Sequence, residues 1–289
     1  MQLVSSWLDE TAPGLSRRKE TRFLLESAPV WAPILACPTL ADAPSDIRKA
    51  LLHLCYSDSA IGEGCWWVVA TNWVVHFDSK HKWQNLAALL SNGFNIWETF
   101  GKVPFLSVFF GAAVFSSSFA LGVHAQNRAN FVKDVPLAYM MDWIGASSFV
   151  DVISSSYSHR VQAAGASGGI CALGGCGLCI NLHWLYSRIQ MPYITQTQTP
   201  PYDIICNLLL DGSAFGRLLI VYQQLSFITA DVFLLASGDH VGHAQHLSGS
   251  LFGITSYFLL SYLYRNDRGP SGGLSSERRW GAGRRLGQS

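Results

Sequence analysis

Residues 161–187 read VQAAGASGGICALGGCGLCINLHWLYS and contain no Asp, Glu, Lys or Arg. A helix of roughly 20 residues crosses a hydrocarbon core of about 30 Å, so this run is long enough to span a bilayer. Two further runs without these charged residues cover 103–123 and 241–264. Hydrophobic residues make up 49% of the chain and charged residues 13%, which is about half the charged share of a soluble domain. The sequence therefore predicts an all-α, polytopic membrane protein.

The spacing of the apolar blocks predicts six membrane spans. Five of them are expected at 83–97, 103–123, 163–186, 215–235 and 241–264. A first span at 27–41 is expected to be a poor helix, because Pro29, Pro33 and Pro38 interrupt it. Basic residues gather near both ends of the chain, so the positive-inside rule favours cytoplasmic termini and an even number of spans.

The segments outside these spans divide the chain into parts. We expect a polar cytoplasmic segment at 1–22 without a signal peptide, a membrane domain at 23–264, and a basic flexible tail at 265–289. Within the membrane domain we expect a Trp-rich interfacial segment at 64–75, an apolar surface stretch at 135–150 and a loop at 189–203. The lipid bilayer of an endomembrane or the plasma membrane is the expected surrounding. The net charge of +1 gives no reason to expect nucleic acid as a partner.

The seven cysteines do not form a disulfide or zinc framework. Those at 171, 176 and 179 lie in one apolar block at irregular spacing, which favours small buried hydrophobic residues over zinc ligands. Asp239 with His240 and His243 is an alternative metal site, but exposed loop and interface histidines are the preferred interpretation. The sequence therefore predicts no metal and no cofactor.

Two motifs near the ends of predicted spans supply the groups of a serine nucleophile. The sequence GASGG at 165–169 holds Ser167 between glycines, which leave room for another backbone. His246, Gly249 and Gly253 fall at i, i+3 and i+7, so they share one helix face that can pack closely. An imidazole on such a face can reach the serine and accept its proton.

A third motif supplies donors for an oxyanion. His81 and Asn85 are i, i+4 neighbours at the beginning of the span 83–97. Both side chains can donate hydrogen bonds to a developing negative charge.

The three motifs together resemble those of the rhomboid family of intramembrane serine proteases. That family carries Gly-x-Ser-Gly on its fourth span, His-x-x-Gly-x-x-x-Gly on its sixth and His-x-x-x-Asn on its second. These patterns are matched by Gly165, Ser167 and Gly168, by His246, Gly249 and Gly253, and by His81 and Asn85. Glu98 and Gly101 match a glutamate and a glycine that follow the His-x-x-x-Asn motif in the family. The resemblance covers residues 70–264.

The resemblance implies a six-helix bundle and a specific chemistry. Ser167 would attack the scissile carbonyl and His246 would accept its proton, as a dyad without an acidic third member. The Ser167 backbone N–H, His81 and Asn85 would hold the oxyanion. The implied substrates are transmembrane segments of other membrane proteins. The glycines expected to pack helices are Gly165, Gly168, Gly249 and Gly253.

Alternatives to this interpretation remain open. A catalytically inactive rhomboid-like protein would bind or escort membrane proteins, although both dyad residues are present. The pattern Gly-x-Ser-x-Gly is also typical of α/β-hydrolases, with an acid such as Asp211, Asp231 or Asp239 before the histidine, but no series of strands precedes it. Ser167 as a helix-packing residue, and His243 in place of His246 as the base, are the remaining alternatives.

Overall fold

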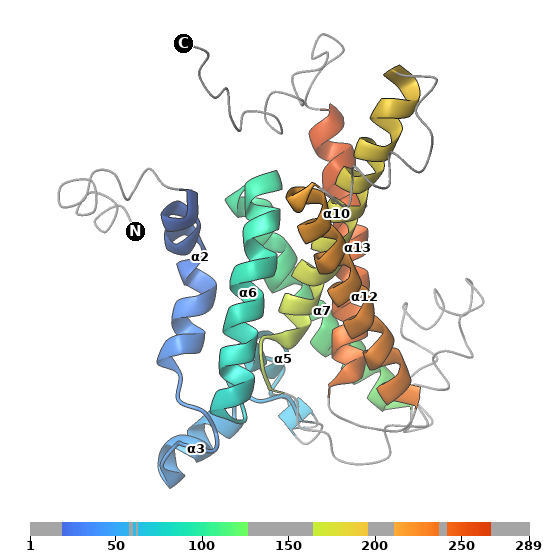
Figure 1. The fold of residues 1–289 in the computed structure, drawn as a ribbon. Coiled ribbons are helices and arrows are strands. Elements are labelled where there is room, and N and C mark those ends of the chain that lie inside the picture. The colour runs from blue at the N-terminus through green and yellow to red at the C-terminus, as the bar shows by residue number, and fades with distance from the viewer. Residues whose placement is uncertain are drawn as a thin grey trace, which may run out of the picture.

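The computed structural model describes residues 19–57, 60–61, 63–126, 164–195, 211–236 and 242–266. Every element in these ranges is a helix, as predicted (Figure 1). Five long helices overlap the five predicted spans: α6 (Ser79–Phe100), α7 (Lys102–Gln126), α10 (Ser167–Thr195), α12 (Gly212–Ala236) and α13 (His243–Asn266). Within the described residues, α7, α10 and α12 are long and apolar enough to cross a membrane by length and composition alone.

Helix α2 (Lys19–Ala36) differs from its predicted form, because it continues through Pro29 and Pro33. A proline inside a helix removes one hydrogen bond and crowds the preceding turn, and packing must offset this cost. The face that includes Phe23, Val30 and Ile34 is buried in the main core. The carbonyls that end the helix are also satisfied, since Lys82 Nζ lies 2.9 Å from Leu35 O and 2.7 Å from Cys37 O.

Several predicted connections also change. Helix α10 extends to Thr195, so the loop predicted at 189–203 is wrong over its first seven residues, and Pro192 does not end the helix. The Trp-rich segment forms two short helices, α5 (Val68–Thr71) and η1 (Asn72–Val74). A short helix α3 (Ser45–Leu52) precedes them. The apolar stretch predicted at 135–150 lies outside the described residues.

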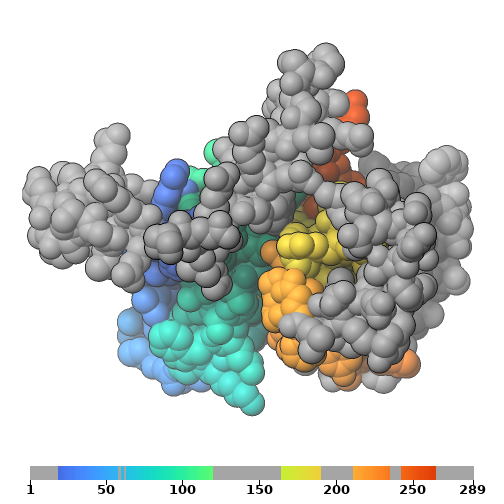
Figure 2. Space-filling view, turned by 45° about the horizontal axis from the view of Figure 1, so that its top comes forward, coloured from blue at the N-terminus to red at the C-terminus, as the bar shows by residue number. Residues whose placement is uncertain are grey.

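Helix α10 is the centre of the bundle and packs most extensively against α13. In the apolar 18-residue window of α10, 72% of the residues are buried, against 6% in the corresponding window of α12. Helix α12 is therefore peripheral, and Figure 2 shows it (orange) at the surface beside α6 (teal), to which Gln224 joins it by a hydrogen bond to Asn92. This arrangement leaves one end of α10 surrounded by α6, α7 and α13.

Glycines make the contact between α10 and α13 possible. A Cβ atom added to Gly249 would overlap the carbonyl oxygen of Gly168, and one added to Gly253 would overlap that of Ala172. A Cβ at Gly175 would in the same way meet the carbonyl of Ser250. The two backbones thus touch directly, which is the close approach that small residues allow between helices in membranes.

Candidate active site

The backbone leading into α10 adopts a conformation that requires glycine. Gly165 has a φ of +125°, and a Cβ at this position would lie 3.0 Å from His81 Cε1. Residues with a side chain rarely adopt such a φ, so both the backbone conformation and the limited space favour glycine. The Gly165 N–H donates to the carbonyl of Asn72 at 2.9 Å. These contacts fix the turn after which Ser167 begins the helix.

The first turn of α6 places His81 and Asn85 over this loop. Asp78 caps the helix, because its Oδ1 accepts a hydrogen bond of 2.8 Å from the His81 N–H. Asn85 Nδ2 lies 3.1 Å from His81 Nε2 and 3.5 Å from the position of a Cβ on Gly165. His81 and Asn85 therefore lie together beside the loop that precedes Ser167.

A third histidine, His76, supports this loop and was not singled out from the sequence. It is buried, its ring packs edge-on against His81 at 5.4 Å, and its Nδ1 lies 3.3 Å from Val74 O. The Ala166 N–H points to its Nε2 at 3.5 Å. Burial lowers the pKa of His76 to about 4, so the ring is neutral at pH 7 and its Nε2 acts as the acceptor. Its only sequence signal was a histidine just before the capped helix.

Helix α13 brings His246 to the same end of α10. Gly249, one turn after His246, packs against Gly168, the residue that follows Ser167. Within the described residues, no hydrogen bond joins Ser167 Oγ to His246; such bonds are often long or poorly aligned before a substrate binds.

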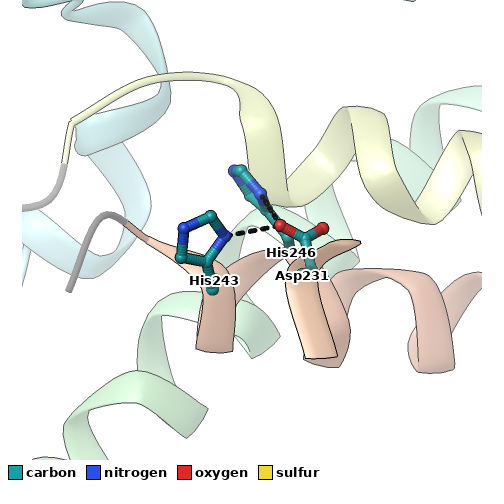
Figure 3. Close-up of side chains that lie close together, drawn as sticks. All are labelled: Asp231, His243 and His246. Atoms are coloured by element: carbon teal, nitrogen blue, oxygen red, sulfur yellow. Dashed lines mark hydrogen bonds and ion pairs between the residues drawn. The ribbon is translucent and has the colours of Figure 1, made fainter. Parts of the chain in front are cut away.

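The side chain of Asp231 on α12 contacts two histidines of α13 (Figure 3). Its Oδ1 lies 2.6 Å from His243 Nδ1 and 3.1 Å from His246 Nδ1. The side chains of Asp231 and His243 are only 13% and 11% exposed. The sequence predicts exposed loop and interface histidines here, and exposure is wrong for His243 because it begins α13 and packs towards α12. Asp239 and His240 lie outside the described residues.

The contact of Asp231 with the two histidines is not among the predictions from the sequence. The sequence suggests Asp231 only as an acid in the α/β-hydrolase pattern, an interpretation that the all-helical fold excludes for the described part of the chain. A usable signal did exist, since an ionisable residue inside a predicted span is by default a functional hypothesis.

A cavity whose lining includes several polar side chains lies between α6, α10 and α12. Its volume is about 430 Å³. Across it, Gln224 Nε2 donates to Asn92 Oδ1 at 3.0 Å, and Arg217 Nη1 donates to Asn181 Oδ1 at 2.7 Å. These polar contacts join α12 to α6 and α10 beside an apolar cluster, in which Leu178 and Leu185 of α10 pack against Ala214 and Val221 of α12.

Comparison with known proteins identifies the fold. A family model for the rhomboid domain matches residues 63–263, which include α6, α7, α10, α12 and nearly all of α13. Searches of curated proteins and of solved structures each found no match.

Proposed function

The chain belongs to the rhomboid family, and we propose that it is an intramembrane serine endopeptidase that cleaves transmembrane segments of other membrane proteins. The rhomboid domain and the long apolar helices make it a multi-pass membrane protein. The family includes serine proteases, and its members act on membrane proteins as substrates or clients.

One observation carries the proposal: the glycine contact between α10 and α13. Because Gly249 touches Gly168, the first turns of both helices meet, with Ser167 on one and His246 on the other. His81 and Asn85 approach from α6 on the side of Gly165. Ser167, His246, His81 and Asn85 thus lie at one end of the bundle, which supports assigning them the roles of nucleophile, base and donors that acyl transfer requires.

The proposed chemistry begins with Ser167. Its Oγ attacks the carbonyl carbon of the scissile peptide bond while its proton passes to His246 Nε2. The tetrahedral oxyanion accepts hydrogen bonds from the Ser167 N–H at the positive end of α10, and from His81 and Asn85. His246 then donates the proton to the leaving amine, and water later hydrolyses the acyl-enzyme ester. A substrate helix must unwind locally first, because its carbonyls and amides are otherwise paired.

Cleavage of a model single-span substrate tests the proposal. We expect the wild-type protein to cleave it, and Ser167→Ala or His246→Ala to lower the rate by at least about 10³-fold. Ser187→Ala, at the other end of the same helix and exposed, is the matched control and should cleave normally. A fluorophosphonate should label Ser167 in the wild-type protein and in Ser187→Ala, but not in Ser167→Ala. Cleavage that persists in Ser167→Ala would contradict the assignment.

A second candidate function is binding of membrane proteins without cleavage. It is favoured by the cavity between α6, α10 and α12, whose lining includes the amide side chains of Asn95 and Gln223. This function predicts that client proteins co-purify intact, to the same extent with the wild-type protein and with Ser167→Ala.

A further inference from the structure

Asp231 is a largely buried carboxylate in the span region of α12. A charged side chain in such a segment is costly unless it faces the protein interior and pairs with other groups. In this protein it pairs with His243 and His246, both from α13. The cost of placing a carboxylate there is therefore offset at the site of the proposed base, rather than at an unrelated position.

The contact with Asp231 defines which nitrogen of His246 carries hydrogen. An ionised carboxylate only accepts hydrogen bonds, so at 3.1 Å from Asp231 Oδ1 the hydrogen of His246 belongs on Nδ1. In a neutral imidazole this leaves Nε2 without hydrogen. Nε2 is then able to take a proton, and the imidazolium that forms stays next to a negative charge.

His243 holds the carboxylate in place. Its Nδ1 lies 2.6 Å from the same oxygen, Oδ1, and it precedes His246 by three residues on the same helix. Two donors from adjacent turns of α13 therefore fix the rotamer of Asp231. They also join peripheral α12 to α13 at the level of the proposed base (Figure 3).

We propose that Asp231 is a positioning residue for His246, so that catalysis depends on Ser167, His246 and Asp231 rather than on a dyad. This inference rests on the proposed function. Asp231 holds the imidazole in the tautomer that can accept the serine proton and stabilises its charged form, as a buried acid does in other serine hydrolases. It does not contact the substrate or take up the proton itself.

The same three residues could be considered as metal ligands, since their ligand atoms lie within 4.8 Å of one another. Around a tetrahedral zinc ion with bonds of about 2.0 Å, ligand atoms lie about 3.3 Å apart. His243 Nδ1 and Asp231 Oδ1 are closer, at 2.6 Å, and both imidazoles address a single oxygen. This geometry favours direct hydrogen bonds over metal coordination.

Kinetics of Asp231→Asn in detergent or liposomes test the proposal. An amide can donate to Nδ1 and select the wrong tautomer, so we expect kcat to fall roughly 10²–10⁴-fold with little change in KM. Asp231→Glu should recover part of this loss. Asp211→Asn, an exposed acid just before the same helix, is the control and should retain wild-type kcat. The melting temperatures of all variants show whether they are folded.

A spectroscopic readout separates this inference from the proposed function. With [¹⁵N]histidine, NMR should show an Nδ1–H signal for His246, and the loss of this signal in His246→Ala assigns it. The signal should also disappear in Asp231→Asn. An unchanged His246 tautomer, or unchanged kcat in a protein that needs Ser167, overturns the role of Asp231. If the wild-type protein does not cleave, the proposed function fails, and the tautomer still decides whether Asp231 positions the histidine. Activity that a chelator removes and zinc restores overturns the proposal in favour of a metal site.

Discussion

His76 illustrates how a single residue supports the candidate site without belonging to its chemistry. It lies under the loop that carries Ala166 and against the ring of His81. Its neutral form is the one that accepts a hydrogen bond from the loop, since a protonated ring has no acceptor nitrogen. The protonation state of His76 is therefore linked to the geometry of the residues that lead into Ser167.

We predict that the protein becomes less stable as the pH falls below 6.5, because of His76. The pKa of His76 is about 4 in the folded protein, below its ordinary value of 6.5, mainly because of burial. The unfolded chain thus binds the proton first, so stability is fully present above pH 6.5 and declines as pH falls towards 4. The resulting loss in the free energy of unfolding is on the order of 2 kcal/mol at pH 5. Melting temperatures in detergent at pH 7 and pH 5 measure it.

Two histidine variants, one at His76 and a control at an exposed histidine, test this prediction. His76→Gln should lose a few degrees less than the wild-type protein between pH 7 and pH 5, because it has no group that titrates there. His53→Gln, which changes an exposed histidine, should behave as the wild-type protein does. Equal pH dependence in His76→Gln and the wild-type protein would show that His76 is not responsible.

At the residue scale, the part of the site that could be predicted is the part encoded by local spacing. His81 with Asn85, and His246 with Gly249, are related by helical periodicity, which the sequence displays directly. Asp231 and His76 depend instead on partners in other elements. His76 contacts Ala166, 90 residues further along the chain, and no periodicity within one helix reports such a contact.

At the scale of the elements, the contact between α10 and α13 depends on the absence of side chains. We predict that Gly249→Ala separates the two helices, because its Cβ would overlap the Gly168 carbonyl oxygen, which is backbone and unable to rotate away. Such overpacking typically costs 1–3 kcal/mol. Cleavage should also decrease at least about tenfold, since His246 moves with the first turns of α13. Melting temperature and cleavage rate of the variant measure both effects.

Gly216→Ala on α12 is the matched control for this change. Nothing lies within 4 Å of a Cβ at Gly216, so alanine should stabilise the helix slightly, by up to about 1 kcal/mol, and leave cleavage intact. Full stability and activity in Gly249→Ala would mean that the helices do not depend on their direct backbone contact.

Helix positions were predictable from apolar blocks, whereas several helix ends and the form of α2 were not. The blocks predict spans because a bilayer core sets a minimum length, and that constraint acts on each segment separately. Pro29 and Pro33 predicted a broken first helix, but their local cost is offset by packing and by the Lys82 ammonium at the end of α2. Such compensation comes from α6, so the sequence of residues 19–36 alone contains no trace of it.

At the scale of the whole molecule, α12 is the least buried of the three long apolar helices. Few of its span residues are buried, and a cavity lies between it and α6 and α10. Its described connections to the rest of the bundle include Gln224 with Asn92, Arg217 with Asn181, and Asp231 with the histidines of α13. We therefore expect a transmembrane substrate of the proposed protease to reach Ser167 between α6 and α12.

We predict that joining α6 to α12 blocks membrane substrates selectively. Asn92 and Gln224 are in hydrogen-bond contact, so the double variant Asn92→Cys with Gln224→Cys is within reach of a short bifunctional thiol reagent. Cross-linking should lower cleavage of a single-span substrate at least about tenfold, because the segment can no longer pass between the helices. Labelling of Ser167 by a small fluorophosphonate should persist, since the first turns of α10 and α13 do not move. Each single cysteine variant, treated with the same reagent, controls for modification of the native cysteines. Equal loss of both reactions would show that the cross-link distorts the site itself, and loss of neither would show that substrates reach Ser167 by another route.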